Sequence, residues 1–312
     1  MDDIFLPELV ADPVNNQAYV WLLMKSNTYL PGVFTSMFSV LKTNPKADLV
    51  LMYTEDMEDH IEIIKKITPH LCLIPYLTFE TSPLISKRQN TLYKTWKSSS
   101  YTKWNCLALP YEKVILLDAD TITTENIDHL FDLPCPSAPF SSPYIEPLGE
   151  IRNYCKGEKD STGYLEHGQP VKKREIKKML WSHGNLLTAS TILIKPSMQD
   201  FSDYLDMMKK KQPFGTQKTY SMVDEQSIVM FYVLEKNQIF HNIHHRYNYI
   251  SWKEGYLNTS PIIIHYFSDT KPWQAAYDLY PDFKLWYEVA TAALEFYSIL
   301  PDDIMLNSNN MP

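Results

Sequence analysis

Glycine is scarce in this sequence, which has only 8 glycines in 312 residues. Neither the dinucleotide-binding pattern G-x-G-x-x-G nor the phosphate-binding pattern G-x-x-x-x-G-K-[ST] occurs,. These absences exclude a Gly-rich loop as the element that holds a phosphate. A phosphorylated ligand would have to be held by side chains or by a metal ion.

Cysteine is also sparse. The sequence has no C-x-x-C pair and no Cys/His metal spacing among its four cysteines, Cys72, Cys106, Cys135 and Cys155,. The amino terminus lacks a basic start followed by an apolar run, and no stretch approaches the roughly 18 apolar residues of a membrane span,. We therefore expect reduced thiols, no membrane span and a cytoplasmic location.

Basic charge is not in excess, because 29 Lys and Arg residues stand against 37 Asp and Glu residues, for a net charge of -8. The basic residues are scattered, which argues against nucleic acid or an anionic membrane as the main partner. Apolar residues make up 45% of the chain, enough to fill a large core,. We expect a globular protein whose main partner is a small molecule.

Apolar strand patterns alternate with helical patterns in the first part of the chain. Residues 19–25, 48–53 and 70–75 are expected to be strands, and residues 31–41 and 57–67 to be helices,. This alternation predicts an α/β fold with a single Rossmann-like, mostly parallel sheet flanked by helices on both faces.

The same alternation continues after residue 100, interrupted by an irregular region. Further strands are expected at 113–118, 191–194 and 262–265, and further helices at 101–109, 197–210, 223–235 and 284–300,. No internal repeat or low-complexity linker is present, so we expect one domain over 1–312. Its expected additions are an irregular, variable insertion at about 141–185, a helical carboxyl-terminal extension at about 275–300 and a flexible tail at 302–312.

Two acids follow the apolar strand at 113–118. Asp118 and Asp120 are two residues apart, and a turn beyond the strand can point both carboxylates at one hard divalent cation,. Ligands in open α/β sheets bind outside the carboxyl ends of the strands, so the location fits a site. By itself an Asp-x-Asp pair is common by chance, and a solvated turn explains it equally well.

A second polar group follows the β-branched run at 262–264. It reads His265-Tyr-Phe-Ser-Asp-Thr-Lys271-Pro-Trp273. An imidazole combined with carboxylates suits a borderline ion such as Mn²⁺, and a lysine can supply a point charge to a phosphate. Taken alone, the histidine would be a satisfied structural residue and the lysine a solvated one. Their combination with the two acids favours a site.

These motifs resemble those of the glycogenin-like glycosyltransferases, which carry a DxD after a strand and a late HxxGxxKPW. The resemblance covers most of 19–273. Six further pieces lie in the family's order: Ser26-Asn-Thr-Tyr29-Leu-Pro-Gly32, Thr102-Lys103, Asn126-Ile-Asp-His-Leu-Phe131, Ile194-Lys195-Pro196-Ser197, Asp224-Glu225-Gln226 and Tyr247-Asn248. Such an ordered set is hard to produce by chance.

The resemblance implies a GT-A fold and a divalent metal, Mn²⁺ with Mg²⁺ as an alternative, bound by Asp118, Asp120 and His265. The metal would bridge the phosphates of a UDP-sugar, and Asp118 would also touch the ribose. Further donor contacts are implied for Lys271 at the pyrophosphate, Lys103 at the sugar or phosphates, Tyr29 and Ser26 in the uridine loop, and Asp224 at the sugar.

Several positions depart from the family pattern. Ser268 replaces the glycine of the late motif, and Lys25-Ser26 stands where Thr-Asn is typical. Two positions that the family directs at the sugar read Thr188-Ala189-Ser190 and Phe140. The family's Asp-Gln pair carries one extra carboxylate here, so either Asp224 or Glu225 takes the aspartate's role. The identity of the donor sugar therefore stays open.

The implied function is Mn²⁺-dependent transfer of a hexose, from UDP-glucose or a similar donor, to a hydroxyl acceptor with retention of configuration. Glu225 and Gln226 are the candidates for the residues beside the anomeric carbon. Retention is compatible with a covalent intermediate or with front-face attack, and glutamine is a poor nucleophile, which favours the front-face route.

Two alternatives use the same residues. One is a catalytically silent protein that binds nucleotide-sugar or glycan. The other is a self-glycosylating initiator whose acceptor is one of the tyrosines near Tyr247, Tyr249 or Tyr256. The acceptor of an ordinary transferase could be a glycan, a protein or a small molecule. The resemblance also implies a homodimer.

Overall fold

The computed structural model describes residues 6–140, 143–145, 151–153, 165–181, 186–219, 221–251 and 260–312. Cys155 and Tyr256 lie outside these residues, and so does much of the expected insertion. The expected reduced state holds for Cys72, Cys106 and Cys135, which are free thiols.

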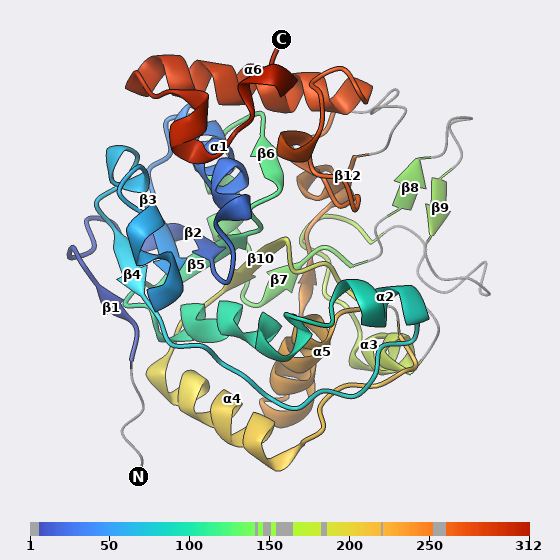
Figure 1. Cartoon of the computed structure of the whole chain (residues 1–312). Coiled ribbons are helices and arrows are strands. Elements are labelled where there is room, and N and C mark those ends of the chain that lie inside the picture. Colours follow the sequence, from blue (N-terminus) through green and yellow to red (C-terminus); the bar gives the residue numbers. More distant parts are fainter. Residues whose placement is uncertain are drawn as a thin grey trace.

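Within the described residues, the centre of the molecule is an eight-stranded sheet (Figure 1). In spatial order its strands are β1 (Glu8–Leu9), β4 (Leu71–Leu73), β3 (Asp48–Tyr53), β2 (Gln17–Leu23), β5 (Lys113–Leu117), β10 (Thr191–Ile194), β7 (Ser137–Ala138) and β11 (His241–Asn242). The central run β4-β3-β2-β5 is parallel, as expected. Antiparallel pairing appears outside this run, where β1 joins β4 and β10 joins β5 and β7.

The continuous apolar runs of the central strands reflect burial on both faces. In β2, Ala18 and Val20 belong to the core on one face of the sheet, whereas Tyr19, Trp21 and Leu23 belong to the core on the other. Side chains alternate between the faces of a strand, so a strand covered on both sides needs apolar residues at every position.

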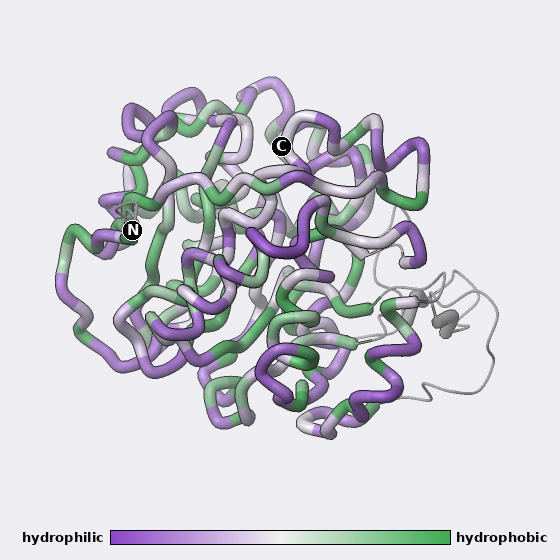
Figure 2. Tube along the Cα trace, turned by 90° about the horizontal axis from the view of Figure 1, so that it is seen from below, coloured by the Kyte–Doolittle hydropathy of each residue, from purple (hydrophilic) through white to green (hydrophobic). Residues whose placement is uncertain are grey.

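Helices cover both faces. One face carries α1 (Leu30–Leu41) and α6 (Pro281–Tyr297), and the other carries the 3₁₀ helix η4 (Lys97–Ala108), α4 (Met198–Lys210) and α5 (Val223–Met230) (Figure 1). Of the two short helices, α2 (Lys87–Leu92) and α3 (Lys173–Leu180), α3 contributes Ile176, Met179 and Leu180 to the core that α4 and α5 also cover. Hydrophobic residues concentrate in the interior strands and hydrophilic residues in the outer loops (Figure 2).

A smaller three-stranded sheet lies beside the main one. Its order is β12 (Tyr249–Ile250), β13 (Ile263–His265) and β6 (Thr121–Thr123). The strands β8 (Pro143–Ile145) and β9 (Ile151–Asn153) form a separate hairpin. The small sheet matters for function because β6 follows β5 directly and β13 carries the late motif.

Several helical segments differ from the expected α-helices. Residues 57–67 form two short 3₁₀ helices, η2 (Glu55–His60) and η3 (Ile64–Lys66), and 223–235 is α5 followed by the π-helical turn η6 (Phe231–Glu235). The remaining 3₁₀ turns are η1 (Asn27–Tyr29), η5 (Asp128–Asp132), η7 (His245–Tyr247), η8 (Pro272–Gln274), η9 (Pro301–Ile304) and η10 (Ser308–Asn310). Apolar periodicity predicts helical segments but does not distinguish these hydrogen-bonding patterns.

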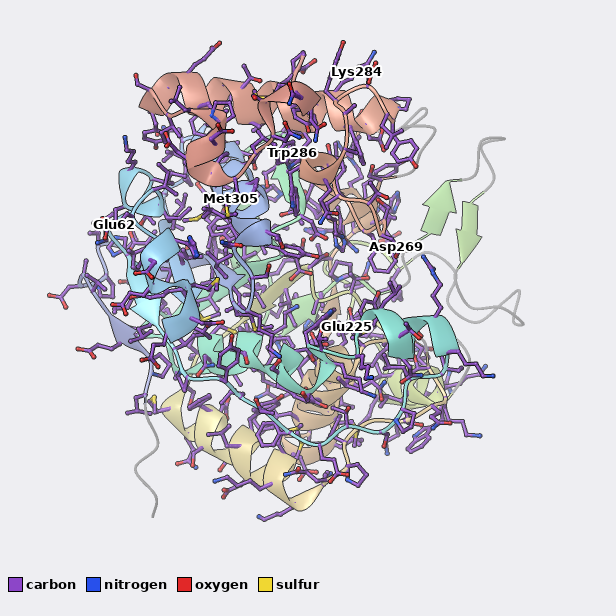
Figure 3. All side chains as sticks on the ribbon, viewed as in Figure 1. Glu62, Glu225, Asp269, Lys284, Trp286 and Met305 are labelled. Atoms are coloured by element: carbon purple, nitrogen blue, oxygen red, sulfur yellow. The ribbon has the colours of Figure 1, made fainter. Side chains whose placement is uncertain are left out.

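The carboxyl-terminal segment is more ordered than expected. In α6 the side chain of Trp286 points into the domain and that of Lys284 points outward (Figure 3). Residues 302–312 were expected to be flexible, but Ile304 and Leu306 are completely buried. The Tyr277 amide also donates to the Asn310 carbonyl over 2.8 Å. Two buried apolar side chains therefore anchor this otherwise polar segment.

Candidate metal centre and donor site

The Asp118-Ala119-Asp120 segment is a tight turn between β5 and β6. The Asp118 amide donates to the Ser190 carbonyl of the β10 side over 3.1 Å. The Thr121 hydroxyl donates to the Asp118 carbonyl over 2.8 Å. These two hydrogen bonds fix the turn, so that both carboxylates lie beyond the carboxyl end of β5.

The antiparallel pairing of β13 with β6 brings the late motif to this turn. His265 lies opposite Thr121 in the register. Its Nε2 is 3.3 Å from Oδ1 of Asp120, and its Nδ1 is 3.1 Å from the amide oxygen of Asn248. That oxygen also accepts the Ser190 hydroxyl over 2.6 Å. Because an amide oxygen can only accept, Nδ1 carries the hydrogen and the Nε2 lone pair faces the acids.

Asp118, Asp120 and His265 therefore form one cluster. Each offers a ligand atom, and these atoms lie within 4.8 Å of one another. Two carboxylates and one imidazole suit a borderline divalent ion such as Mn²⁺. The oriented imidazole supports this fit, since metal-bound histidines commonly donate their other ring N–H to a polar partner. These three side chains are the ones that would hold the metal.

Lys271 closes one side of the cluster. Its Nζ donates to Oδ2 of Asp120 over 2.6 Å and to the Tyr266 carbonyl over 2.9 Å, and the residue is only 8% exposed. Burial lowers the pKa of Lys271, but the Asp120 carboxylate outweighs it and the net pKa is raised. For Asp120, burial raises the pKa, but Lys271 and His265 outweigh burial and hold the pKa well below its usual range. Both groups are therefore charged at neutral pH.

Lys103 links the metal cluster to α5. Its Nζ is 3.1 Å from Oδ1 of Asp118 and 3.5 Å from Oδ2 of Asp224. Burial lowers the pKa of Lys103, but the two carboxylates outweigh it and the net pKa is raised. Asp224 is 4% exposed, and its Oδ1 is buried without a hydrogen-bond partner in the structure. This buried oxygen therefore keeps unused acceptor capacity.

The next two residues of α5 differ sharply in their surroundings. Glu225 is partly exposed, and its Oε1 and Oε2 accept the amides of Ala189 (3.1 Å) and Met222 (3.0 Å). Burial of its carboxyl group and the neighbouring Asp224 raise the pKa of Glu225 to about 8. Gln226 is completely buried, accepts the Thr216 amide over 2.9 Å and donates to the Ser221 carbonyl over 2.9 Å. Gln226 therefore holds the loop before α5, and the structure does not support its expected place beside the anomeric carbon.

The residues expected to form a uridine loop lie at the same sheet edge, after β2. Ser26 caps η1, its hydroxyl accepting the Thr28 amide over 3.3 Å. The Tyr29 ring is 38% exposed and meets Trp273 of the late motif edge-on, with centroids 5.5 Å apart. The structure thus brings the amino-terminal loop next to the Lys-Pro-Trp segment.

Sequence reasoning missed some residues of the site and misplaced one. Asn248 orients His265, although its motif alone gave it no role. Tyr93 lies within electrostatic reach of Lys271, Glu225 and Asp120, in a segment without a periodic signal. Phe140 was expected to face the sugar, but it is 2% exposed and packs on Phe240 with ring centroids 5.4 Å apart. An apolar ring at that position is buried in the core instead.

Gly32 allows α1 to approach the acid turn. A Cβ built there would lie 2.5 Å from the Trp273 ring and 2.8 Å from the Ala119 carbonyl oxygen. Gly32→Ala is therefore expected to destabilise the fold by about 1–3 kcal/mol through overpacking. It should also weaken Mn²⁺ binding, because Ala119 lies between the two acids. Thermal unfolding and Mn²⁺ titration check this, and wild-type values for both would contradict the close approach.

Asn248→Ala tests the orientation of His265. Losing the amide oxygen frees the imidazole to change tautomer and rotate, while Asp118 and Asp120 are untouched. We expect Mn²⁺ affinity to fall about 10–100-fold, the usual effect of removing a residue that orients a metal ligand. Titration calorimetry with Mn²⁺ measures this. Asn248→Asp, which keeps an acceptor oxygen, should retain most of the affinity, and equal losses in both variants would count against the orienting role.

No helix in the described part of the chain is both long and apolar enough to cross a bilayer.

The chain resembles several known proteins in sequence. The uncharacterized protein R707 of Acanthamoeba polyphaga mimivirus is 26% identical over 267 residues, covering 83% of each chain. UDP-glucuronate:xylan alpha-glucuronosyltransferase 2 of Arabidopsis thaliana is 33% identical over 135 residues, which is 43% of this chain and 21% of that protein. Galactinol synthase 1 of Solanum lycopersicum is 30% identical over 122 residues, which is 38% of this chain and 36% of that protein. The match thus spans only a minor part of either plant enzyme.

Solved glycosyltransferase structures share the fold. The galactosyltransferase LgtC, in complex with donor and acceptor sugar analogs, superposes with a TM-score of 0.50 at 11% identity, over 88% of this chain and 95% of that one. The bifunctional glycosyltransferase WbbM gives a TM-score of 0.51 at 13% identity, over 93% of this chain and 53% of that one. The expected GT-A fold is thereby confirmed. The model of glycosyl transferase family 8 matches residues 21–276, most of the chain, and the chain therefore belongs to glycosyl transferase family 8.

Proposed function

We propose that this chain is a Mn²⁺-dependent, retaining glycosyltransferase that moves a neutral hexose from a UDP-sugar to a hydroxyl acceptor. The observation that carries the proposal is the buried Asp120, which joins the ligand cluster to Lys271 (2.6 Å) and to His265 (3.3 Å). Asp120 thus connects the residues that would bind a metal ion with the lysine that would bind a phosphate.

Breaking the bond between a sugar and a diphosphate builds negative charge on the departing UDP. A metal bound by Asp118, Asp120 and His265 would supply Lewis-acid stabilisation of that charge. Lys271 adds a positive charge next to these ligands, and its side chain is only 8% exposed. Removing a single preorganised group of this kind typically costs about 10²–10³ in kcat.

The charges around Lys103 favour a donor sugar without a carboxylate. Lys103 is already shared between Asp118 and Asp224, and Lys271 is paired with Asp120. The carboxylate of a glucuronate donor would therefore lie near the carboxylates of Asp118 and Asp224. Neither lysine among these contacts is unpaired and available to neutralise it. A neutral hexose would add no further negative charge beside Asp118 and Asp224. This favours a neutral hexose, although one plant relative is named for UDP-glucuronate.

The uridine end of the donor would lie against the half-exposed ring of Tyr29, close to Ser26. Aromatic rings commonly stack on nucleobases. Tyr29 is supported from behind by Trp273, which directly follows Lys271-Pro272 in sequence. Base stacking and pyrophosphate binding would thus depend on one short segment.

Self-glycosylation at the expected tyrosines has little support in the described residues. Tyr249 is only 4% exposed. The Tyr247 hydroxyl is 2.6 Å from Nε2 of His129. Burial keeps the Tyr249 hydroxyl from attacking a sugar, whereas the contact with His129 does not exclude Tyr247. We propose an external acceptor, and Tyr256 lies outside the described residues.

Release of UDP from a donor panel tests the proposed function. The chain would be incubated with UDP-glucose, UDP-galactose and UDP-glucuronate, with Mn²⁺ or with a chelator, using GDP-mannose as the control for the base. We expect Mn²⁺-dependent release from a neutral hexose donor and no release from GDP-mannose. Binding of UDP and Mn²⁺ without release from any donor would favour the catalytically silent protein.

A further inference from the structure

The contacts of Lys103 settle which residue of Asp224-Glu225-Gln226 stands in which role. Asp224 is the acid that reaches Lys103, at 3.5 Å, and through Lys103 it is linked to Asp118. Asp224 therefore takes the part of the aspartate in the family's Asp-Gln pair. The residue that follows it, where the family pattern has glutamine, is Glu225. A carboxylate thus replaces an amide at this position.

The carboxyl group of Glu225 is held in a fixed position. It lies in the first turn of α5, near the centre of the molecule (Figure 3). One oxygen accepts the Ala189 amide and the other the Met222 amide. Each oxygen has two lone pairs, so one hydrogen bond to each leaves both able to approach a ligand. The positive end of the α5 helix dipole favours the charged form that attack requires, whereas burial and Asp224 oppose it and raise the pKa of Glu225 to about 8.

The surroundings of Glu225 are those of the donor site. Ala189, which binds its Oε1, precedes Ser190, whose carbonyl accepts the Asp118 amide. The charge of Glu225 influences the pKa values of both Lys103 and Tyr93. Glu225 therefore lies within electrostatic range of Lys103, a residue proposed to contact the donor.

We propose that Glu225 is the nucleophile of a double displacement, an inference that rests on the proposed function. In the first step a Glu225 oxygen bonds to the anomeric carbon, and the bond from that carbon to the phosphate oxygen breaks. UDP leaves with the electron pair, and the sugar is held as an ester of Glu225.

In the second step an acceptor hydroxyl bonds to the anomeric carbon and the ester bond breaks. The hydroxyl proton passes to the UDP phosphate or to the released carboxylate. Two inversions give net retention, and no further reactant is needed.

The other polar groups at the site are less suited to this role. Asp118 and Asp120 belong to the metal cluster, and Asp224 is 4% exposed and paired with Lys103. Gln226 is an amide with its side chain completely buried. Among the described acids around Lys103, Glu225 combines partial exposure with freedom from a lysine partner within salt-bridge distance.

Rescue by azide tests the proposal. Glu225→Ala should lower transfer at least about a thousandfold. Sodium azide should then restore UDP release by filling the space of the missing carboxylate, and the product should be a glycosyl azide of inverted configuration. Glu235→Ala, on the turn that follows α5, is the matched control and should behave as wild type. Thermal unfolding of each variant checks that it is folded.

Trapping the covalent intermediate in the wild-type chain gives a second test, which does not depend on the Glu225→Ala variant. Wild-type chain mixed with donor and Mn²⁺, without acceptor, would be quenched in acid and its peptides weighed; we expect a hexosyl ester on Glu225. The proposal is overturned if Glu225→Ala and Glu225→Gln transfer within tenfold of wild type. It is equally overturned if azide fails to rescue a folded Glu225→Ala and no ester forms on Glu225. Absence of UDP release by wild type from every donor would instead refute the proposed function itself.

Discussion

Asp120→Asn is expected to lower kcat/KM for the UDP-sugar by about 10³-fold or more, together with a large loss of Mn²⁺ affinity. Asparagine keeps the shape of the side chain but removes the charge that both the metal and Lys271 require. Lys271 would also lose its 2.6 Å partner while staying only 8% exposed. The loss of this ligand removes the metal's charge stabilisation, worth about 10²–10³ in rate, and leaves Lys271 without its partner in the nucleotide-free chain.

Two measurements check this prediction. UDP release at saturating Mn²⁺ gives kcat/KM, and Mn²⁺ titration followed by electron paramagnetic resonance gives the metal affinity without requiring activity. Asp278→Asn is the matched control, because it makes the same chemical change at an exposed residue. If Asp120→Asn bound Mn²⁺ as wild type does, Asp120 would not be a ligand and the metal centre would have to be placed elsewhere.

The sequence was informative for the site wherever a polar residue directly follows an apolar strand. Asp118 and Asp120 follow β5, and His265 ends β13, so each was detectable as a polar residue at a strand end. What brings them together is the antiparallel pairing of β13 with β6, two strands about 140 residues apart in sequence,. No local pattern encodes that pairing, and only the family resemblance anticipated its result.

Roles that depend on a contact between distant residues were not predictable. The order Asp224-Glu225-Gln226 permits two assignments one residue apart, and our proposal of Asp224 rests on the contact of Lys103 with Asp224. Similarly, Asn248 gained its role because its amide oxygen lies 3.1 Å from His265. In each case the sequence gives the type of side chain, but it does not show which distant residue that side chain contacts.

In the fold, too, local sequence patterns predicted some features, whereas features that depend on short strands or on isolated residues were not predictable. Double burial of β2, β3 and β5 produced continuous apolar runs, so the parallel centre of the sheet could be predicted,. The antiparallel additions come from short strands such as β7 (Ser137–Ala138), which are too brief for a periodic signal. The polar carboxyl-terminal segment was expected to be flexible because two buried residues, Ile304 and Leu306, do not form a pattern.

Lys271→Met is expected to change metal binding and catalysis in opposite directions. Without nucleotide, Lys271 holds Oδ2 of Asp120, so its ammonium group competes with a metal for the same carboxylate. At 4 Å, two unit charges near a protein surface interact by about 4 kcal/mol. Removing the lysine should therefore raise the Mn²⁺ affinity of the nucleotide-free chain about tenfold or more. At the same time kcat/KM should fall about 10²–10³-fold, because UDP departs without its lysine.

Because Mn²⁺ affinity is expected to rise while kcat/KM falls, this prediction distinguishes a catalytic lysine from a structural one. A lysine that served only to stabilise the fold would lower metal affinity and activity together when replaced. Lys284→Met, on the outward side of α6 (Figure 3), is the control for loss of a lysine and should leave both quantities unchanged. Lys271→Arg should not restore activity, because the larger guanidinium group must fit a site that is only 8% exposed,. Weaker Mn²⁺ binding by Lys271→Met would show that the lysine supports the metal centre and does not compete with the metal for Asp120.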